Sequence, residues 1–226
     1  MAEVLALGLS HKTAPLELRE RLALTEGRAT SVMNELTAAP EIREATVVST
    51  CNRTELYLVA EDTVEAETTA LSVLSREAEI RPTELTSHLY SLRASDAARH
   101  LFQVTAGLDS MIIGEAEIQG QVKRAYELSL VEGATGPILN RLFRGAISAG
   151  GRARNETGIS EKGVSVPSVA VELARRTLGD LSTSHALVIG AGETADLVAR
   201  ALVARGSQTV FVANRHYDRA IGLAQR

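Results

Sequence analysis

The sequence has one cysteine, no tryptophan and few aromatic residues of any kind. The single cysteine, Cys51, excludes an intrachain disulfide and any metal site built from several cysteines. It favours a reducing, cytoplasmic setting, and we expect no bound metal. Because aromatic residues make up only 3% of the chain, the cores must consist of Leu, Val, Ile and Ala, which favours helices and buried parallel strands. No apolar run is long enough to span a bilayer, and the amino terminus lacks the features of a signal peptide, so we expect no membrane contact.

The length and the net charge indicate how many domains to expect and which kinds of partner are excluded. With 226 residues the chain is long enough for two domains, each with its own core. The net charge is −4, from 24 basic and 28 acidic residues, which argues against a general nucleic-acid binder. The charge is uneven, because residues 61–79 are acidic whereas residues 137–155 contain four arginines and no acid.

The spacing of apolar residues predicts a mixed α/β chain. Strands and helices alternate at first, which predicts an α/β sandwich with strands at 4–10, 46–50, 55–60 and 88–92 and helices after Pro15, at 25–38 and at 63–80. Appended helices are expected at 95–105, about 115–132 and 137–154. A turn-rich segment at 155–163 predicts a linker, and Pro167 suits the first turn of a further helix that Gly179 ends. We expect a first domain at 1–157, a linker helix at 158–183 and a last domain at 184–226.

Cys51 lies where an apolar strand ends, in VVSTCNRTELY. Strand ends favour chemistry because the strand fixes a position while the turn leaves side chains accessible. Arg53 lies two residues further on, and a fixed positive charge lowers the pKa of a neighbouring thiol and makes it more nucleophilic. The alternative is a structural role, because free cysteine is often buried as a small hydrophobe.

A glycine-rich polar segment, GLDSMIIGEAEIQGQ, covers residues 107–121. Glycine inside a helix costs about 1 kcal/mol relative to alanine. Gly120 therefore predicts close packing or the approach of a ligand, and we expect close packing.

HALVIGAGETADLVARALVARGSQTVFVANR reads as a strand, a glycine turn, a helix and a second strand, which predicts a βαβ unit that binds a dinucleotide. Gly190 permits the tight turn, Gly192 lets backbone amides approach a pyrophosphate, and Ala195 is the small residue where helix meets strand. The helix beginning near Glu193 directs its positive end at the phosphates. The alternative is a tight turn that binds nothing.

The second strand ends in Asn214 and Arg215, where an NAD site usually has a carboxylate. A guanidinium in that place favours the 2′-phosphate of NADP. The chain stops soon afterwards, in the start of the next helix, so we expect a partial Rossmann-type domain in a truncated chain.

These features together resemble the glutamyl-tRNA reductase family. The resemblance covers the whole chain in order, through GLSHKTAPLELRERLA, VVSTCNRTELY, GLDSMIIGEAEIQGQVKRAY, NETGIS, SVAVELA and VIGAGETA followed by VANR. It implies an N-terminal catalytic domain that binds glutamyl-tRNA and a partial NADP-binding domain.

The resemblance implies a reaction in which Cys51 attacks the ester of glutamyl-tRNA and NADPH reduces the resulting thioester to glutamate-1-semialdehyde, the first step toward 5-aminolevulinate and tetrapyrroles such as heme. His100 is carried over as a residue important for activity, as general base, leaving-group acid or orienting group; the residues alone favour a core histidine. The carried-over substrate residues are Thr50, Asn52, Arg53, Ser110, Glu115, Ala116, Glu117 and Gln121. The carried-over cofactor residues are Gly190, Ala191, Gly192, Glu193, Thr194, Ala195, Asn214 and Arg215.

Arg53 suits a forked hydrogen bond to the glutamyl carboxylate or a structural ion pair, and both roles stay open. Two positions depart from the family pattern. Glu117 stands where the family often has glutamine, which makes it a weaker candidate contact for an anionic substrate. His216 stands where the family has a hydroxyl residue, so recognition of the 2′-phosphate falls more on Arg215.

Arg141, Arg144 and Arg152 fall on one helix stripe, which is either a phosphate-contacting surface for tRNA or a solvated polar face.

The resemblance also implies the aminomutase that takes the semialdehyde as a candidate partner. It implies a homodimer in the full-length family member, through a C-terminal domain that we expect this chain to lack. Two alternatives remain: a noncatalytic tRNA- or effector-binding module, or a truncated chain that forms and hydrolyses the thioester without reducing it.

Overall fold

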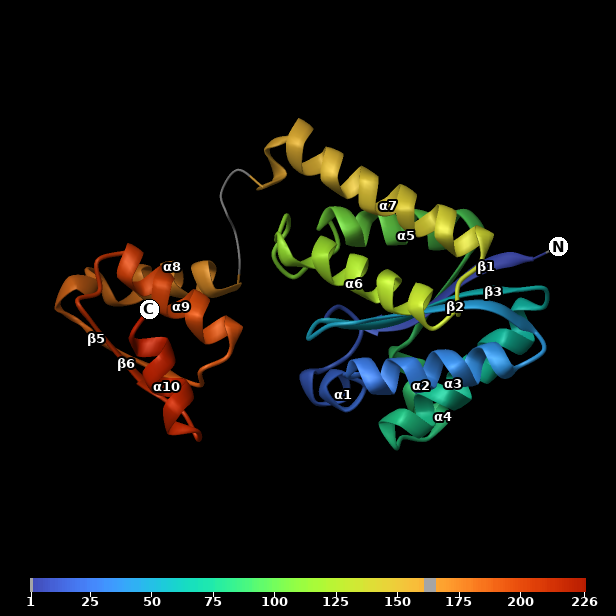
Figure 1. Cartoon of the computed structure of the whole chain (residues 1–226), viewed down its shortest axis with the longest axis horizontal. Helices are drawn as coiled ribbons and strands as arrows, with labels where there is room; N and C mark the ends of the chain where they lie inside the picture. Colours follow the sequence, from blue (N-terminus) through green and yellow to red (C-terminus); the bar gives the residue numbers. More distant parts are fainter. Residues whose placement is uncertain (1, 161–165) are drawn as a thin grey trace. The chain divides into compact units, whose positions relative to one another are not determined.

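The computed structural model describes residues 2–160 and 166–226, in two compact units that divide between Ser160 and Glu161 (Figure 1). The first unit begins with β1 (Glu3–Ser10), α1 (Leu16–Arg21), α2 (Glu26–Ala38), β2 (Ile42–Ser49), β3 (Arg53–Ala60) and α3 (Thr63–Ala78). It continues with α4 (Pro82–Leu85), the 3-10 turn η1 (Thr86–His88), β4 (Tyr90–Arg93), α5 (Ala94–Ala106), α6 (Glu117–Val131), α7 (Pro137–Glu156) and η2 (Gly158–Ser160). The predicted mixture of an α/β sandwich with appended helices is confirmed.

The four strands of the first unit form one sheet in the order β2-β3-β1-β4. Every neighbouring pair in this sheet is antiparallel, although the low aromatic content favours parallel strands. The reason is local: β2 and β3 are joined by a turn of four residues, 50–53 by register, and so short a connection permits only an antiparallel pair.

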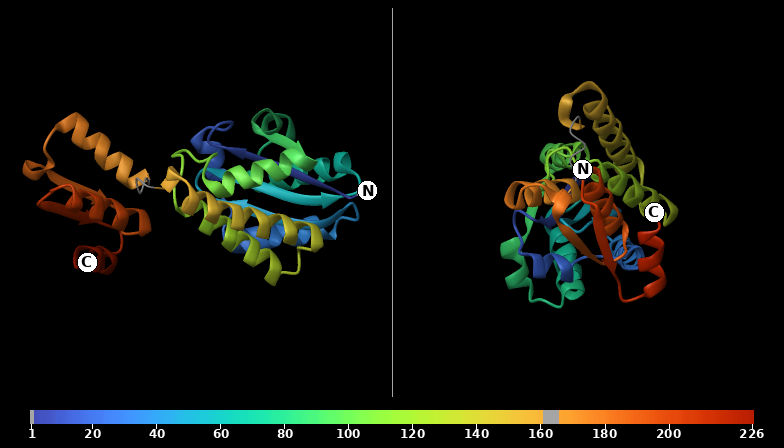
Figure 2. Two further views of the ribbon diagram at one scale, coloured as in Figure 1. Left: turned by 90° about the horizontal axis from the view of Figure 1, so that it is seen from above. Right: turned by 90° about the vertical axis from the view of Figure 1, so that its left-hand side faces the viewer.

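Helices cover both faces of this sheet (Figures 1 and 2). Along β3, Leu56 and Leu58 pack into a core with α1, α2, α3 and α4, whereas Tyr57 and Val59 pack into a second core with α5, α6 and α7. The alternation follows from the two-residue period of a strand. Because β3 is covered on both faces, all its residues from Arg53 to Ala60 are buried.

Polar residues also enter this buried strand. Glu55 lies opposite Gly8 of β1, and a Cβ at Gly8 would lie 2.9 Å from the Glu55 Cγ and 2.6 Å from the carbonyl oxygen of Thr54. Only glycine at position 8 leaves the neighbouring strand close enough to enclose the Glu55 side chain.

The second unit contains α8 (Val166–Leu178), the 3-10 turn η3 (Leu181–Thr183), β5 (His185–Ile189), α9 (Glu193–Ala204), β6 (Thr209–Ala213) and α10 (Tyr217–Ala224). β5 and β6 pair in parallel across α9, so the predicted βαβ fragment is confirmed. Val171, Leu181, Val188 and Leu202 form its core.

The helix expected within 158–183 corresponds to α8, which packs on α9 inside the second unit. Part of the linker expected at 155–163 falls outside the described residues. In the two described ranges, no helix has the length and apolar character needed to cross a membrane.

Candidate active site

Cys51 lies at the tip of the turn between β2 and β3, and its side chain is exposed. The Thr50 hydroxyl accepts hydrogen bonds from the backbone N–H groups of Asn52 (3.1 Å) and Arg53 (3.2 Å), which closes the turn. The backbone N–H of Thr50 donates to the carbonyl of Arg53 at 2.8 Å. The alternative in which Cys51 packs in a core is therefore wrong.

Two residues from the start of the chain hold this turn in place. The guanidinium of Arg19 donates to the carbonyl oxygen of Cys51 at 2.7 Å and to the Asn52 Oδ1 at 3.3 Å. The backbone N–H of His11 donates to the Asn52 carbonyl at 2.8 Å. The position of the thiol is thus fixed by its backbone neighbours while its side chain stays accessible.

Arg53 points away from solvent and forms a buried ion pair. Its side chain is 1% exposed, and its two terminal nitrogens donate to the Glu55 Oε1 at 2.6 Å and to the Asp109 Oδ2 at 3.1 Å. The second nitrogen also donates to the Asp109 carbonyl oxygen at 2.5 Å. Of the two roles left open, the structure shows the ion pair, which joins the thiol turn to the loop after α5.

Glu55 is fully buried and accepts hydrogen bonds from several side chains on different elements. Besides Arg53, the Tyr57 hydroxyl donates at 2.7 Å and the His100 Nε2 lies at 2.9 Å, and the Tyr90 hydroxyl donates from β4. The cation of Arg53 together with these hydrogen bonds holds the pKa of Glu55 at about 2 despite its burial. Glu55 is therefore a carboxylate at neutral pH.

His100 comes from α5 and is mostly buried, with 12% of its side chain exposed. Its ring lies edge-on to Tyr90, with centroids 5.2 Å apart. Because the Glu55 carboxylate only accepts hydrogen bonds, the His100 Nε2 carries hydrogen. In the neutral imidazole, Nδ1 is then the nitrogen with a lone pair.

The environment of the thiol raises the pKa of Cys51 above its ordinary value. Partial burial is the largest cause, and the carboxylates of Glu115 and Glu117 add to it, whereas Arg19 opposes them. Arg53 is the cation that the sequence places next to the thiol, but the charged side chains that shift the pKa of Cys51 are Glu115, Glu117 and Arg19. The charge of Arg53 is already paired in the interior, and the remaining balance favours the neutral thiol.

The loop between α5 and α6 contains two glycines with positive φ, Gly107 (80°) at its start and Gly114 (83°). A Cβ at Gly114 would lie 2.1 Å from the carbonyl oxygen of Ile159, so no other residue fits there. Arg154 of α7 donates to the Glu115 carbonyl at 2.9 Å and to the Thr105 carbonyl at 3.1 Å, which fixes both ends of the loop.

This loop brings several predicted substrate residues toward the thiol turn. Ser110 is buried beside Glu115, and Asp109 binds Arg53 and Lys12. Ala116 and Glu117 are exposed at the start of α6, and Gln121 is half-buried one helical turn further on.

Gly120 has no close neighbour beyond the Arg124 side chain at 3.5 Å from a built Cβ, so the expected close packing is wrong. Ordinary van der Waals space surrounds this position on α6, and an alanine would fit there.

In the second unit, the glycine turn follows β5 as expected. Gly190 has φ of 115°, and its N–H donates to the Ala213 carbonyl at 2.7 Å. Gly192 is the N-cap of α9, and no described atom lies within 4 Å of a Cβ built at either glycine. Open space thus lies against the N-terminus of a 12-residue helix, which fits a pyrophosphate.

The other residues of this region take the following places. Ala195 packs against the core of the unit, while Glu193 and Thr194 are exposed at the start of α9 and Ala191 is half-buried in the turn. The Asn214 side chain donates to the His216 carbonyl at 2.9 Å, and Arg215 is exposed after β6. The residues present therefore fit a dinucleotide with a 2′-phosphate.

Comparison with known families agrees with this geometry. The family described as "Glutamyl-tRNAGlu reductase, N-terminal domain" matches residues 7–157, and that described as "Shikimate / quinate 5-dehydrogenase" matches residues 172–226. The chain belongs to the glutamyl-tRNA reductase family.

Individual glutamyl-tRNA reductases are similar in sequence to this chain along nearly its whole length. It is 43% identical to the glutamyl-tRNA reductase of Magnetococcus marinus, covering 99% of this chain and 53% of that protein. For Deinococcus radiodurans the identity is 44%, over 99% of this chain and 61% of the relative. The solved glutamyl-tRNA reductase of Methanopyrus kandleri is similar at a TM-score of 0.64 and 37% identity, over 98% of this chain and 52% of that one. The chain thus spans about half the length of these glutamyl-tRNA reductases.

Several residues of this candidate site were not predicted from the sequence. They are His11, Lys12, Arg19, Glu55, Tyr90 and Asp109. For Glu55 one feature could have pointed to a buried role, because it is an acid inside the apolar strand ELYLVA. For Arg19 none could, since it meets the turn from 32 residues away.

Proposed function

We propose that the chain accepts the glutamyl group of glutamyl-tRNA on Cys51 and, with NADPH, reduces it to glutamate-1-semialdehyde. The observation that carries this proposal is the exposed thiol on a turn fastened by Arg19 and His11. A fixed backbone and an accessible nucleophile are what attack on a bound ester requires.

In the first step the Cys51 Sγ attacks the ester carbonyl carbon. A C–S bond forms, the C–O bond to the terminal ribose breaks, and the ribose oxygen takes a proton as tRNA leaves. The carboxylates of Glu115 and Glu117 near the thiol suit the α-ammonium group of the glutamyl residue. Binding that cation offsets the negative charge that raises the pKa of Cys51 in the free chain.

His100 is the candidate proton acceptor for this step. Its Nε2 is held by Glu55, which leaves Nδ1 to take the thiol proton or to pass it to the leaving oxygen. Glu55 thereby acts as the group that orients the base, and it also fixes Arg53 under the turn.

NADPH, when bound at the glycine turn of the second unit, would supply the hydride that reduces the thioester carbonyl to an aldehyde, with the C–S bond broken and Cys51 released as a thiolate. In this chain Gly190 and Gly192 would admit the pyrophosphate, and Arg215 would pair with the 2′-phosphate. The product would be the first intermediate of the route to 5-aminolevulinate and tetrapyrroles.

The test is to incubate the chain with glutamyl-tRNA labelled in the glutamate, with and without NADPH, beside the Cys51→Ser variant. Aldehyde formed only by the unchanged chain with NADPH would support the whole proposal. A covalent adduct and free glutamate without aldehyde would restrict this chain to acyl transfer and hydrolysis. Absence of any adduct would refute the proposal and favour a noncatalytic binding module.

A further inference from the structure

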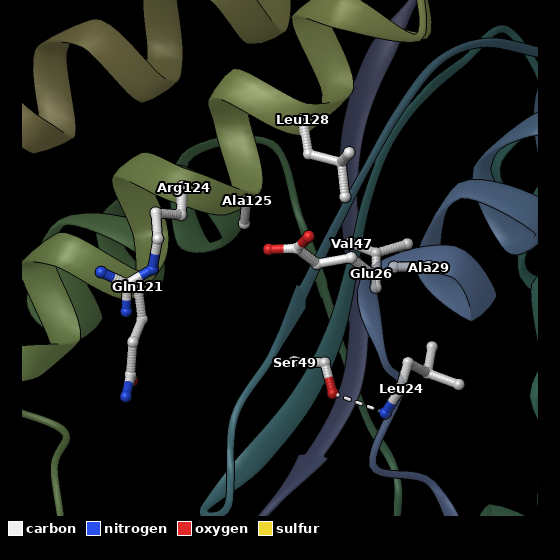
Figure 3. Close-up of a pocket in the computed structure, with 9 residues that line it drawn as sticks. All are labelled: Leu24, Glu26, Ala29, Val47, Ser49, Gln121, Arg124, Ala125 and Leu128. Carbon is white, nitrogen blue, oxygen red and sulfur yellow. Dashed lines mark hydrogen bonds between the residues drawn. The ribbon is translucent and has the colours of Figure 1, made fainter. Parts of the chain in front are cut away.

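A cavity of about 240 Å³ lies between α2, β2 and α6 in the first unit (Figure 3). Ser49 and Gln121 lie at one end of it and Leu128 at the other. Its volume is below the roughly 300–1,000 Å³ typical of drug-sized ligands, so it suits one nucleoside rather than a dinucleotide.

The cavity continues the thiol site along two elements. On the strand side, Ser49 is two residues before Cys51 on the same strand and turn. On the helix side, Glu117 influences the pKa of Cys51, and Gln121 is on the same face of α6 one turn later. The cavity thus lies along the same strand and helix as the thiol turn and the residues near it, and the part of a substrate next to its reacting carbonyl would extend in this direction.

The lining combines an apolar wall with two charges of opposite sign. Val47, Ala125 and Leu128 supply apolar surface, while the Glu26 carboxylate points from the start of α2 toward α6 (Figure 3). In the described part of the chain, neither Glu26 nor Arg124 forms an ion pair with another side chain. Both are thus available to a ligand.

We infer that this cavity receives the terminal adenosine of the tRNA, an inference that rests on the function proposed above. The faces of an adenine ring are apolar and can pack against the apolar wall of the cavity. Its amine can donate a hydrogen bond to the Glu26 carboxylate, and its ring nitrogens accept hydrogen bonds. Gln121, at the end of the cavity near the thiol turn, would contact the ribose, and the guanidinium of Arg124 would pair with the phosphate that adjoins this ribose. The glutamyl side chain suits the cavity less, because Glu26 would repel its carboxylate.

The experiment compares two acyl donors, glutamyl-tRNA and a thiobenzyl ester of glutamate that has no adenosine. Ala125→Leu fills the cavity, Arg124→Gln removes its cation, and Lys123→Gln removes a charge from the adjacent, solvent-exposed position of α6. We expect the first two variants to raise the glutamyl-tRNA concentration for half-maximal adduct formation at least about tenfold. All three should react with the thiobenzyl ester as the unchanged chain does.

Thermal unfolding checks that Ala125→Leu is folded, and Arg124→Gln, an exposed position, supplies the same test without a packing change. Equal losses with both donors, or no loss with glutamyl-tRNA, would overturn the adenosine site. An unchanged chain that forms no adduct from either donor would instead refute the proposed function. In the unchanged chain, glutamyl-tRNA ending in cytidine should react more slowly than glutamyl-tRNA ending in adenosine. In Ala125→Leu, where the cavity is filled, the two should react at the same rate.

Discussion

The Nε2 of His100 and the Oε1 of Glu55 lie 2.9 Å apart, and the carboxylate that His100 meets is fully buried. This contact ties α5 to β3, and Arg53 extends it to the thiol turn and, through Asp109, to the loop before α6. One anion in the interior thus positions groups from elements that are distant in sequence.

Replacing Glu55 by Gln should lower the free energy of unfolding at neutral pH by about 3 kcal/mol, because Arg53 would keep its charge in the interior without its main partner. The pKa of Glu55 is about 2 when folded against an ordinary value of 4.5, so its contribution is complete above about pH 4.5 and is lost as the pH falls toward 2. Urea unfolding at a series of pH values measures both effects.

The control for this prediction is Glu61→Gln, since Glu61 pairs with Arg43 on the surface and both are more than half exposed. This replacement should lower the free energy of unfolding by less than about 1 kcal/mol. Equal losses in the two variants, or an acid dependence that Glu55→Gln leaves unchanged, would contradict a stabilising buried carboxylate.

Replacing Glu115 by Gln should lower the pKa of the Cys51 thiol, because a carboxylate that disfavours the thiolate is removed. Arg19→Gln should raise the pKa further. Alkylation of the single cysteine by iodoacetamide, followed against pH, measures both shifts. Glu132→Gln, at the far end of α6, is the matched control and should leave the curve in place.

Replacing Gly114 by Ala should destabilise the first unit by more than Gly133→Ala does. Both glycines have positive φ, which costs a non-glycine residue about 1–2 kcal/mol. Only Gly114 adds a clash, with the carbonyl oxygen of Ile159, whereas Gly133 is surrounded by open space. Thermal unfolding compares the two, and equal losses would show that Ile159 moves aside without cost.

Replacing Arg215 by Gln should weaken binding of adenosine 2′,5′-bisphosphate about tenfold or more, because one hydrogen bond to a charged group usually contributes that much to the binding constant. Binding of AMP, which lacks the 2′-phosphate, should be unchanged and serves as the internal control. Isothermal titration calorimetry measures both ligands. A parallel loss for the two would mean that Arg215 supports the turn rather than reading the 2′-phosphate.

The elements near the chemistry could be predicted from the sequence because their causes are local. The apolar run before Cys51 ends in a short turn, and the glycines at 190 and 192 stand between a strand and a helix. The order of the strands in the first sheet and the close pairing of Gly8 with Glu55 depend on how strands that are distant in the sequence meet, and no local pattern encodes that.

The electrostatics of the thiol could not be predicted from the sequence for a related reason. Sequence proximity suggested Arg53 as the neighbouring cation, but a side chain at the start of a strand that is covered on both faces turns into the interior. The cation that meets the turn is Arg19, and the carboxylates arrive from the loop before α6. These partners are assembled only by tertiary structure.

The arginine stripe on α7 gives the last prediction. Arg141 and Arg144 are exposed there, and the Nε of Arg144 donates to the Tyr126 hydroxyl at 3.1 Å, which leaves its charge unpaired by any acid in the described ranges. Arg152 differs, because it donates to both carboxylate oxygens of Glu156 at 2.9 and 3.0 Å. Its charge is therefore already compensated.

If the stripe contacts tRNA phosphates, Arg141→Gln and Arg144→Gln should each reduce the slope of log affinity against log salt by about 0.7–0.9. Arg152→Gln is the matched control on the same helix and should change the slope far less, since Glu156 already offsets it. Filter binding of tRNA over a range of salt concentrations gives the slopes. If all three variants keep the original slope, the stripe is a solvated face, and tRNA affinity must arise elsewhere on the chain.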